Sequence, residues 1–140
     1  MVGAMKELSR RAWWLAPEWR WMLWLACVVV STAVLVGPSL ALMLRRQIDT
    51  GENPELDYEL FLASKVFHIS DYALMVVLTA ALPTSRGLRL LLLAFLSLHA
   101  GGTEFVQQFV ETRTGTWRDV GLDHVGIALG LVLTWRWWRR

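Results

Sequence analysis

Long apolar stretches alternate with short polar segments along the whole chain. Four of the stretches have the length of a membrane-spanning helix, and they cover about residues 21–44, 65–82, 88–110 and 119–138. Because a helix rises about 1.5 Å per residue, roughly 20 apolar residues cross the hydrocarbon core of a bilayer. The pattern therefore predicts an all-α protein, in which a single domain over residues 1–140 forms a four-helix transmembrane bundle.

Breaker residues and charged flanks set the expected limits of the outer elements. Gly37-Pro38 predicts a kink in the first span, and Pro83 is expected to end the second. Residues 1–20 mix basic side chains with Trp and Leu. Such a mixture predicts an N-terminal interfacial helix lying on the membrane surface.

The segment between the first two spans is acidic and rich in turn residues. It covers residues 45–64, "RRQIDTGENPELDYELFLAS". Asn53 is suited to cap a helix that has Pro54 at its first position. The segment is therefore expected to be a loop that could hold a short surface helix.

The composition agrees with a membrane protein and excludes several other classes. Hydrophobic residues make up 55% of the chain, and nine residues are Trp, which is far from the mix of an ordinary soluble domain. A net charge of +2 without a basic stripe argues against nucleic-acid binding. The single Cys27 cannot form an intrachain disulfide, and no feature indicates a cofactor.

The distribution of basic residues predicts the orientation in the membrane. With four spans, one side of the bundle carries Lys6, Arg10, Arg11, Arg20, Arg86, Arg89, Arg136, Arg139 and Arg140, nine in all, and the other carries five, Arg45, Arg46, Lys65, Arg113 and Arg118. The positive-inside rule places the side with more basic residues in the cytoplasm. Both termini are therefore expected to be cytoplasmic, in a multi-pass protein of the bacterial inner membrane.

Polar side chains recur at helical spacing in three of the expected spans. The three stripes are Lys65, His68, Tyr72 and Met75; Glu104, Gln107, Gln108 and Glu111; and Asp119, Asp123, Gly126 and Gly130. Ionisable side chains facing lipid would each cost several kcal/mol, so the stripes are expected to face one another. They predict a shared polar pocket near the outer surface.

Glycines within two of the spans predict close helix packing. Gly126-x-x-x-Gly130 continues the stripe of Asp119 one turn deeper, where the missing side chains would let another helix approach. Gly101-Gly102 is expected to serve the same purpose in the third span.

Two segments resemble the VanZ-like family of small bacterial membrane proteins. "SKVFHISDYALM" is similar to that family's D-K-x-x-H-x-x-x-Y, and "EFVQQFVETRTGTWRDVGLDHVGIALG" is similar to its E-x-x-Q, then R, then D-x-x-x-N-x-x-G. The matching positions are Lys65, His68, Tyr72, Glu104, Gln107, Arg113, Asp119 and Gly126, within residues 64–130. The resemblance implies a cell-envelope protein, because the family's namesake is associated with low-level resistance to the glycopeptide teicoplanin, but it implies no settled reaction.

The chain departs from the family pattern at two positions. Ser64 stands where the family usually has Asp, and Asp123 stands where it usually has Asn. Together the two changes keep the formal charge of the expected pocket but shift one negative charge from position 64 to position 123. The preferred ligand is therefore expected to differ from that of typical members.

The polar stripes allow a binding interpretation and a structural one. In the first, an outward-facing pocket binds a polar or anionic group of an envelope molecule, with Lys65 and Arg113 as anion contacts and Glu104 and Asp119 positioning them. In the second, the same residues only hold the bundle of an accessory subunit together. An enzyme with Glu104 as general base and His68 as proton shuttle is a third interpretation.

The expected partners follow from these interpretations. They are the lipid bilayer, a lipid-linked or glycopeptide ligand, and neighbouring membrane subunits that contact a Trp-rich inner rim. This rim comprises Trp13, Trp14, Trp19, Trp21, Trp24, Trp135, Trp137 and Trp138. A metal site is not expected, since His68, His99 and His124 form no H-E-x-x-H motif.

Overall fold

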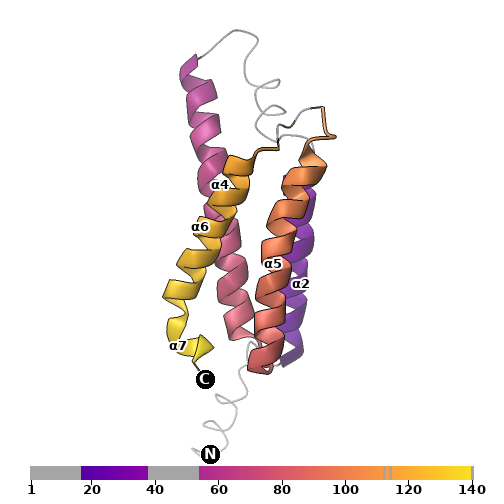
Figure 1. Cartoon of the computed structure of the whole chain (residues 1–140), viewed down its shortest axis with the longest axis vertical. Helices are drawn as coiled ribbons and strands as arrows, with labels where there is room; N and C mark the ends of the chain where they lie inside the picture. Colours follow the sequence, from indigo (N-terminus) through magenta and orange to yellow (C-terminus); the bar gives the residue numbers. More distant parts are fainter. Residues whose placement is uncertain (1–16, 38–53, 112, 114, 140) are drawn as a thin grey trace, which may run out of the picture.

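The described part of the chain is built of helices. The computed structural model describes residues 17–37, 54–111, 113 and 115–139. Its helices are α2 (Pro17–Val36), α4 (Pro54–Ala81), α5 (Arg86–Gln107), α6 (Trp117–Leu133) and the single turn α7 (Trp135–Trp138) (Figure 1). The predicted all-α class is confirmed for these residues. Three helices, Glu18–Val36, α4 and α5, are long and apolar enough to cross a membrane.

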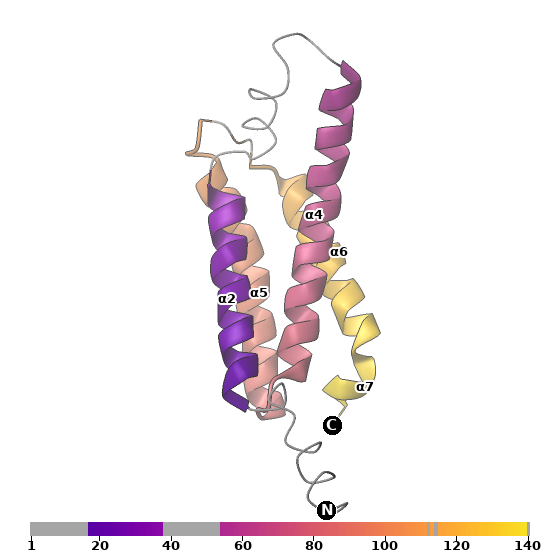
Figure 2. The same cartoon turned by 180° about the vertical axis from the view of Figure 1, so that it is seen from behind.

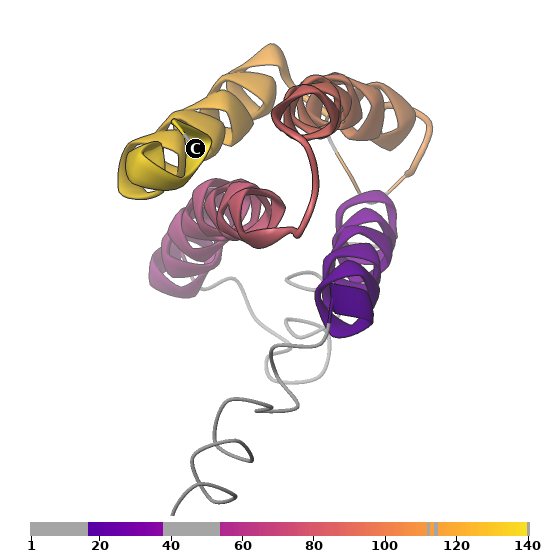
Figure 3. The same ribbon diagram turned by 90° about the horizontal axis from the view of Figure 1, so that it is seen from below.

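The four long helices lie side by side in one bundle, as views from both sides and from below show (Figures 1, 2 and 3). The start of α2, the connection 82–85 and α7 lie at one end, which we call the basal end. The end of α5 and the start of α6 lie at the other, which we call the apical end. Polar stripes in α4, α5 and α6 can therefore meet at a common depth.

The contact between α4 and α6 is the most extensive in the bundle. A Cβ atom added at Gly126 would lie 2.4 Å from the carbonyl oxygen of Ile69, and one at Gly130 would lie 2.8 Å from that of Ala73. Both distances are too short for a side chain. The two glycines therefore allow the backbones of α4 and α6 to touch.

The other predicted glycine pair has a different environment. A Cβ atom at Gly101 or Gly102 would have nothing within 4 Å. The expectation that this pair brings two helices together is thus wrong for the described residues. Gly101 instead lines a small cavity beside Trp117 and Val120 of α6, and Gly102 is exposed.

Several helix limits differ from the sequence expectation. The second span does not begin at Lys65 but continues a helix that starts at Pro54, so the expected loop ends there. Proline is suited to this first helical position, where its missing N–H costs nothing. Residues 38–53, which include the end of the predicted first span, and the predicted interfacial helix up to residue 16 lie outside the described residues.

The predicted fourth span is interrupted near the basal end. α6 ends at Leu133, and the backbone of Thr134 leaves the helical conformation before α7 begins. The Thr134 hydroxyl donates to the Gly130 carbonyl at 2.5 Å and accepts from the Trp138 indole at 2.9 Å. The side chain of Thr134 therefore joins the two helices across the interruption.

The tryptophans of the basal end do not all form an interfacial belt. Trp24 and Trp138 are buried, and the Trp24 indole donates to the Thr79 hydroxyl at 2.8 Å. Trp135 and Trp137 remain exposed. Trp24 thus belongs to the core between α2 and α4, whereas the exposed tryptophans fit the predicted rim.

Candidate functional site

An ion pair joins α4 to the first turn of α6 at the apical end. The Lys65 ammonium contacts the Asp119 carboxylate, whose side chain is only 6% exposed. Thr116 caps α6, because its hydroxyl accepts from the Asp119 N–H at 3.3 Å and donates to the second Asp119 oxygen at 3.0 Å. Both oxygens of Asp119 therefore have partners.

Glu104 of α5 is tied to the same cap. Its Oε2 accepts from the backbone N–H of Thr116 at 2.9 Å, and the residue is 2% exposed. The turn before the cap must come close for this bond to form. A Cβ atom at Gly115 would lie 2.1 Å from the Glu104 carbonyl oxygen, so this position requires glycine.

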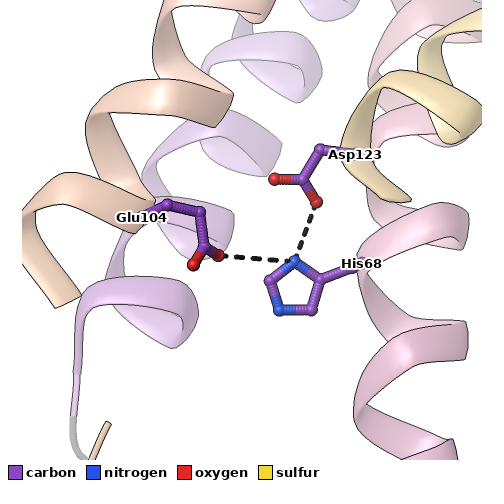
Figure 4. A group of neighbouring side chains, drawn as sticks. All are labelled: His68, Glu104 and Asp123. Atoms are coloured by element: carbon purple, nitrogen blue, oxygen red, sulfur yellow. Dashed lines mark hydrogen bonds and ion pairs between the residues drawn. The ribbon is translucent and has the colours of Figure 1, made fainter. Parts of the chain in front are cut away.

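Three buried side chains converge between α4, α5 and α6 (Figure 4). His68 Nδ1 lies 2.8 Å from Asp123 Oδ1 and 3.9 Å from Glu104 Oε1. Asp123 is completely buried. Within the described residues, Glu104 Oε1 and Asp123 Oδ2 have no hydrogen-bond partner. We call Lys65, His68, Glu104, Thr116, Asp119 and Asp123 the apical polar core.

A chain of hydrogen bonds continues from α4 toward α2. The Tyr72 hydroxyl lies 2.9 Å from His99 Nδ1, and the Thr32 hydroxyl lies 2.8 Å from His99 Nε2. Because Thr32 donates its proton to the Val28 carbonyl at 2.7 Å, His99 must donate from Nε2. His99 then accepts the Tyr72 proton at Nδ1 when its ring is neutral.

Asp71 makes a second polar link between α2 and α4. It accepts a hydrogen bond from the Ser31 hydroxyl, and Ser31 is buried. The sequence analysis did not single out Asp71, Ser31 or Thr32 as site residues. The signal for Asp71 was present, since an ionisable residue within a membrane span marks a functional or structural site by default.

Arg113 and Gln107 occupy the edge of the site. The Arg113 guanidinium donates to the carbonyls of Val34, at 2.6 Å, and Gly37, at 3.2 Å. It thereby satisfies carbonyls that α2 leaves unpaired at its C-terminus. Burial lowers the pKa of Arg113, and the charge of Glu104 opposes that shift. Gln107 is buried, and its amide nitrogen has no hydrogen-bond partner among the residues that the structure describes.

Most of the predicted site residues are brought together. Lys65, His68, Glu104, Asp119 and Asp123 form direct or bridged contacts, and Tyr72 and Gln107 are buried beside them. Arg113 instead binds backbone carbonyls of α2. The outer members of the Glu104 stripe, Gln108 and Glu111, are exposed.

The two ends of the bundle offer openings of very different size. At the apical end, a cavity of about 20 Å³ lies between α5 and α6, lined by Glu104, Gln108, Thr116 and Trp117, which is room for about one water molecule. At the basal end, a cleft of about 510 Å³ is lined by Arg20, Leu82, Arg89 and Trp137. The opening beside Glu104 therefore has room for a small group.

No known family model, curated protein or solved structure matches this chain.

Proposed function

We propose that this chain is a multi-pass protein of the bacterial cytoplasmic membrane, with α2, α4, α5 and the α6–α7 segment as four spans. The exposed surface of α6 supports the fourth span, because Leu129, Val132 and Leu133 are largely exposed apolar side chains. The excess of basic residues at the basal end supports cytoplasmic termini. In this orientation the apical end faces outward.

This orientation predicts opposite labelling of the two ends. In a Cys27→Ser background, Glu111→Cys should react with a membrane-impermeant maleimide added to intact cells, whereas Arg86→Cys should react only after the membrane is opened. Both native side chains are exposed and flank α5 at its two ends. Labelling of Arg86→Cys alone in intact cells would reverse the proposed orientation.

We infer further that the apical opening receives a polar group of an envelope molecule, as the three polar stripes predict. The observation that carries this inference is a buried carboxylate, Glu104, at the base of an opening whose surroundings are exposed aromatics. Phe105, Phe109 and Trp117 are 60%, 74% and 83% exposed. Such rings offer flat, apolar surface to sugars or peptide groups.

The charges favour a hydrogen-bond donor over an anion. Lys65 is already paired with Asp119, and Arg113 is bound to carbonyls of α2, so the two expected anion contacts are engaged. Glu104 is a carboxylate acceptor, and the opening admits about one small group. We therefore propose that an amine, amide or hydroxyl group enters the opening and donates to Glu104.

The test is teicoplanin susceptibility in cells that express the protein. Glu104→Gln should abolish any protective effect, because losing a charge-assisted hydrogen bond weakens binding by about 10–100-fold. Glu111→Gln, which removes an exposed carboxylate near the end of the same helix, should leave the effect intact. Protein abundance is measured in parallel by immunoblotting.

The same experiment addresses a second candidate, an accessory subunit of a larger membrane complex. The basal cleft, which has Trp137 and two arginines in its lining, supports this candidate because it offers a partner a large recess. The polar core is structural if Glu104→Gln lowers the amount of protein but does not change teicoplanin susceptibility once expression is adjusted to the native level. The binding proposal would then fail in favour of the subunit.

A further inference from the structure

The triad of His68, Glu104 and Asp123 has the composition of a metal site. Its members come from three different helices, and one ligand atom from each lies within 4.8 Å of the other two. Figure 4 shows the three side chains directed toward one another. All three are almost fully buried, with exposures of 3%, 2% and 0%. From this geometry we propose that the triad binds one divalent transition-metal ion.

Two buried carboxylate oxygens without hydrogen-bond partners support a bound cation. Glu104 Oε1 and Asp123 Oδ2 are buried, and neither has a hydrogen-bond partner in the described part of the chain. A buried carboxylate oxygen without a partner is costly, and the cost rises in a membrane where water cannot substitute. A cation between the two carboxylates would supply the interaction that both oxygens lack.

The charge balance of the apical polar core points the same way. Of its three carboxylates, only Asp119 has a lysine partner, Lys65. Arg113 is directed to the α2 carbonyls and forms no ion pair within the described residues. Glu104 and Asp123 thus leave a formal charge of −2, which a divalent cation neutralises while His68 remains a neutral ligand.

The donor set selects the class of metal. One imidazole nitrogen with carboxylate oxygens suits Zn²⁺, Fe²⁺ or Mn²⁺, whereas Ca²⁺ and Mg²⁺ prefer oxygen ligands alone. Around a tetrahedral Zn²⁺, ligand atoms about 2.0–2.2 Å from the metal lie roughly 3.4 Å from one another. The observed distances of 2.8 Å and 3.9 Å from His68 Nδ1 bracket that spacing. Metal binding would release the proton that His68 Nδ1 shares with Asp123 Oδ1, so the hydrogen bond between them would be replaced by one bond from each atom to the metal.

The apical opening gives the ion a route to the triad. Glu104 lines the opening and contributes to the triad. A cavity of about 20 Å³ is sufficient for a small cation or a water molecule. Three protein ligands leave one tetrahedral position for water. The metal proposal does not depend on an envelope ligand, since it concerns the side of Glu104 that faces His68.

The proposal is tested by zinc binding to the full-length protein, purified in detergent with a histidine-free tag and stripped with a chelator. Isothermal titration calorimetry should give one Zn²⁺ per chain. His68→Gln should weaken the affinity by about 100-fold or more, since even indirect partners of a metal ligand contribute 10–100-fold. His124→Gln is the matched control, because His124 is exposed in α6 and bonds to Ser97 and Val120.

A second variant guards against misfolding. Asp123→Asn keeps the size of the side chain and an oxygen for His68, and it should also weaken zinc binding by about 100-fold. Each variant is compared with the native protein by gel filtration. The proposal would be overturned if the native protein bound no stoichiometric zinc, or if Asp123→Asn bound zinc with the native affinity. Protons would then neutralise the carboxylates of the triad. Because binding is measured on purified protein, its failure is distinct from failure of the teicoplanin test.

Discussion

Replacing Gly126 by alanine should destabilise the bundle by about 1–3 kcal/mol, the usual cost of overpacking a core. The added Cβ would lie 2.4 Å from the carbonyl oxygen of Ile69 and 3.1 Å from its Cα. These are backbone atoms, so no side-chain rotation relieves the contact. α4 and α6 must move apart instead.

The separation would also loosen the apical polar core. The bonds from His68 to Asp123 and from Lys65 to Asp119 both join α4 to α6. A shift of α6 lengthens them together, which adds to the steric cost. We therefore expect the apparent melting temperature in detergent to fall by roughly 10 °C.

Gly121→Ala is the control for this substitution. It lies in the same helix, and an added Cβ would have nothing within 4 Å. Alanine favours helix over glycine by up to about 1 kcal/mol, so this variant should melt at the native temperature or slightly above. If Gly126→Ala has the same melting temperature as Gly121→Ala, the close approach of α4 and α6 is incorrect.

Replacing Lys65 by methionine should cost about 1–3 kcal/mol, because it removes one member of a partly buried ion pair and leaves the other without its partner. The Asp119 side chain, which is 6% exposed, would keep its negative charge after the Lys65 ammonium is removed. Among the described residues, the Thr116 hydroxyl would remain as its one side-chain partner. The unpaired carboxylate, rather than the missing lysine, causes most of the loss.

Asp119→Asn should therefore rescue Lys65→Met. The asparagine removes the unpaired charge and retains an oxygen for the Thr116 hydroxyl. A double-mutant cycle based on thermal unfolding measures the coupling between the two positions. Arg118→Met, at an exposed neighbouring position in the first turn of α6, should have little effect. A double variant no more stable than Lys65→Met would contradict this account of the pair.

Helical periodicity was the reliable part of the sequence information. Lys65, His68, Tyr72 and Met75 were predicted to share one face of a helix, and the last three are buried in α4. Asp119, Asp123, Gly126 and Gly130 likewise share the buried face of α6. These predictions need only the 3.6-residue repeat and the cost of exposing charge to lipid.

Predictions that depended on a particular neighbour were less successful. Arg113 was expected beside Glu104 and Asp119 as an anion contact, yet it binds the C-terminal carbonyls of α2. Gly101-Gly102 was expected at a close helix contact, but an added Cβ at either glycine would have no described atom within 4 Å. Each residue has the properties expected of it, but the sequence does not say which helix lies opposite.

The metal-site candidate shows the same limit most clearly. Sequence motifs for metals depend on ligands at fixed spacing within one helix, and His68 has no such companion. Glu104 and Asp123 reach it from other helices, more than thirty residues away in the chain. Spacing within one segment therefore gave no indication of the triad.

By itself, the sequence determined that the chain forms apolar helices with polar stripes, because hydropathy and periodicity are properties of each segment alone. Only the tertiary structure decided which polar groups are satisfied and which remain without partners. That outcome depends on the backbone contact of α4 with α6 at Gly126 and Gly130, which brings His68 close to Asp123, and on α5, which places Glu104 beside them.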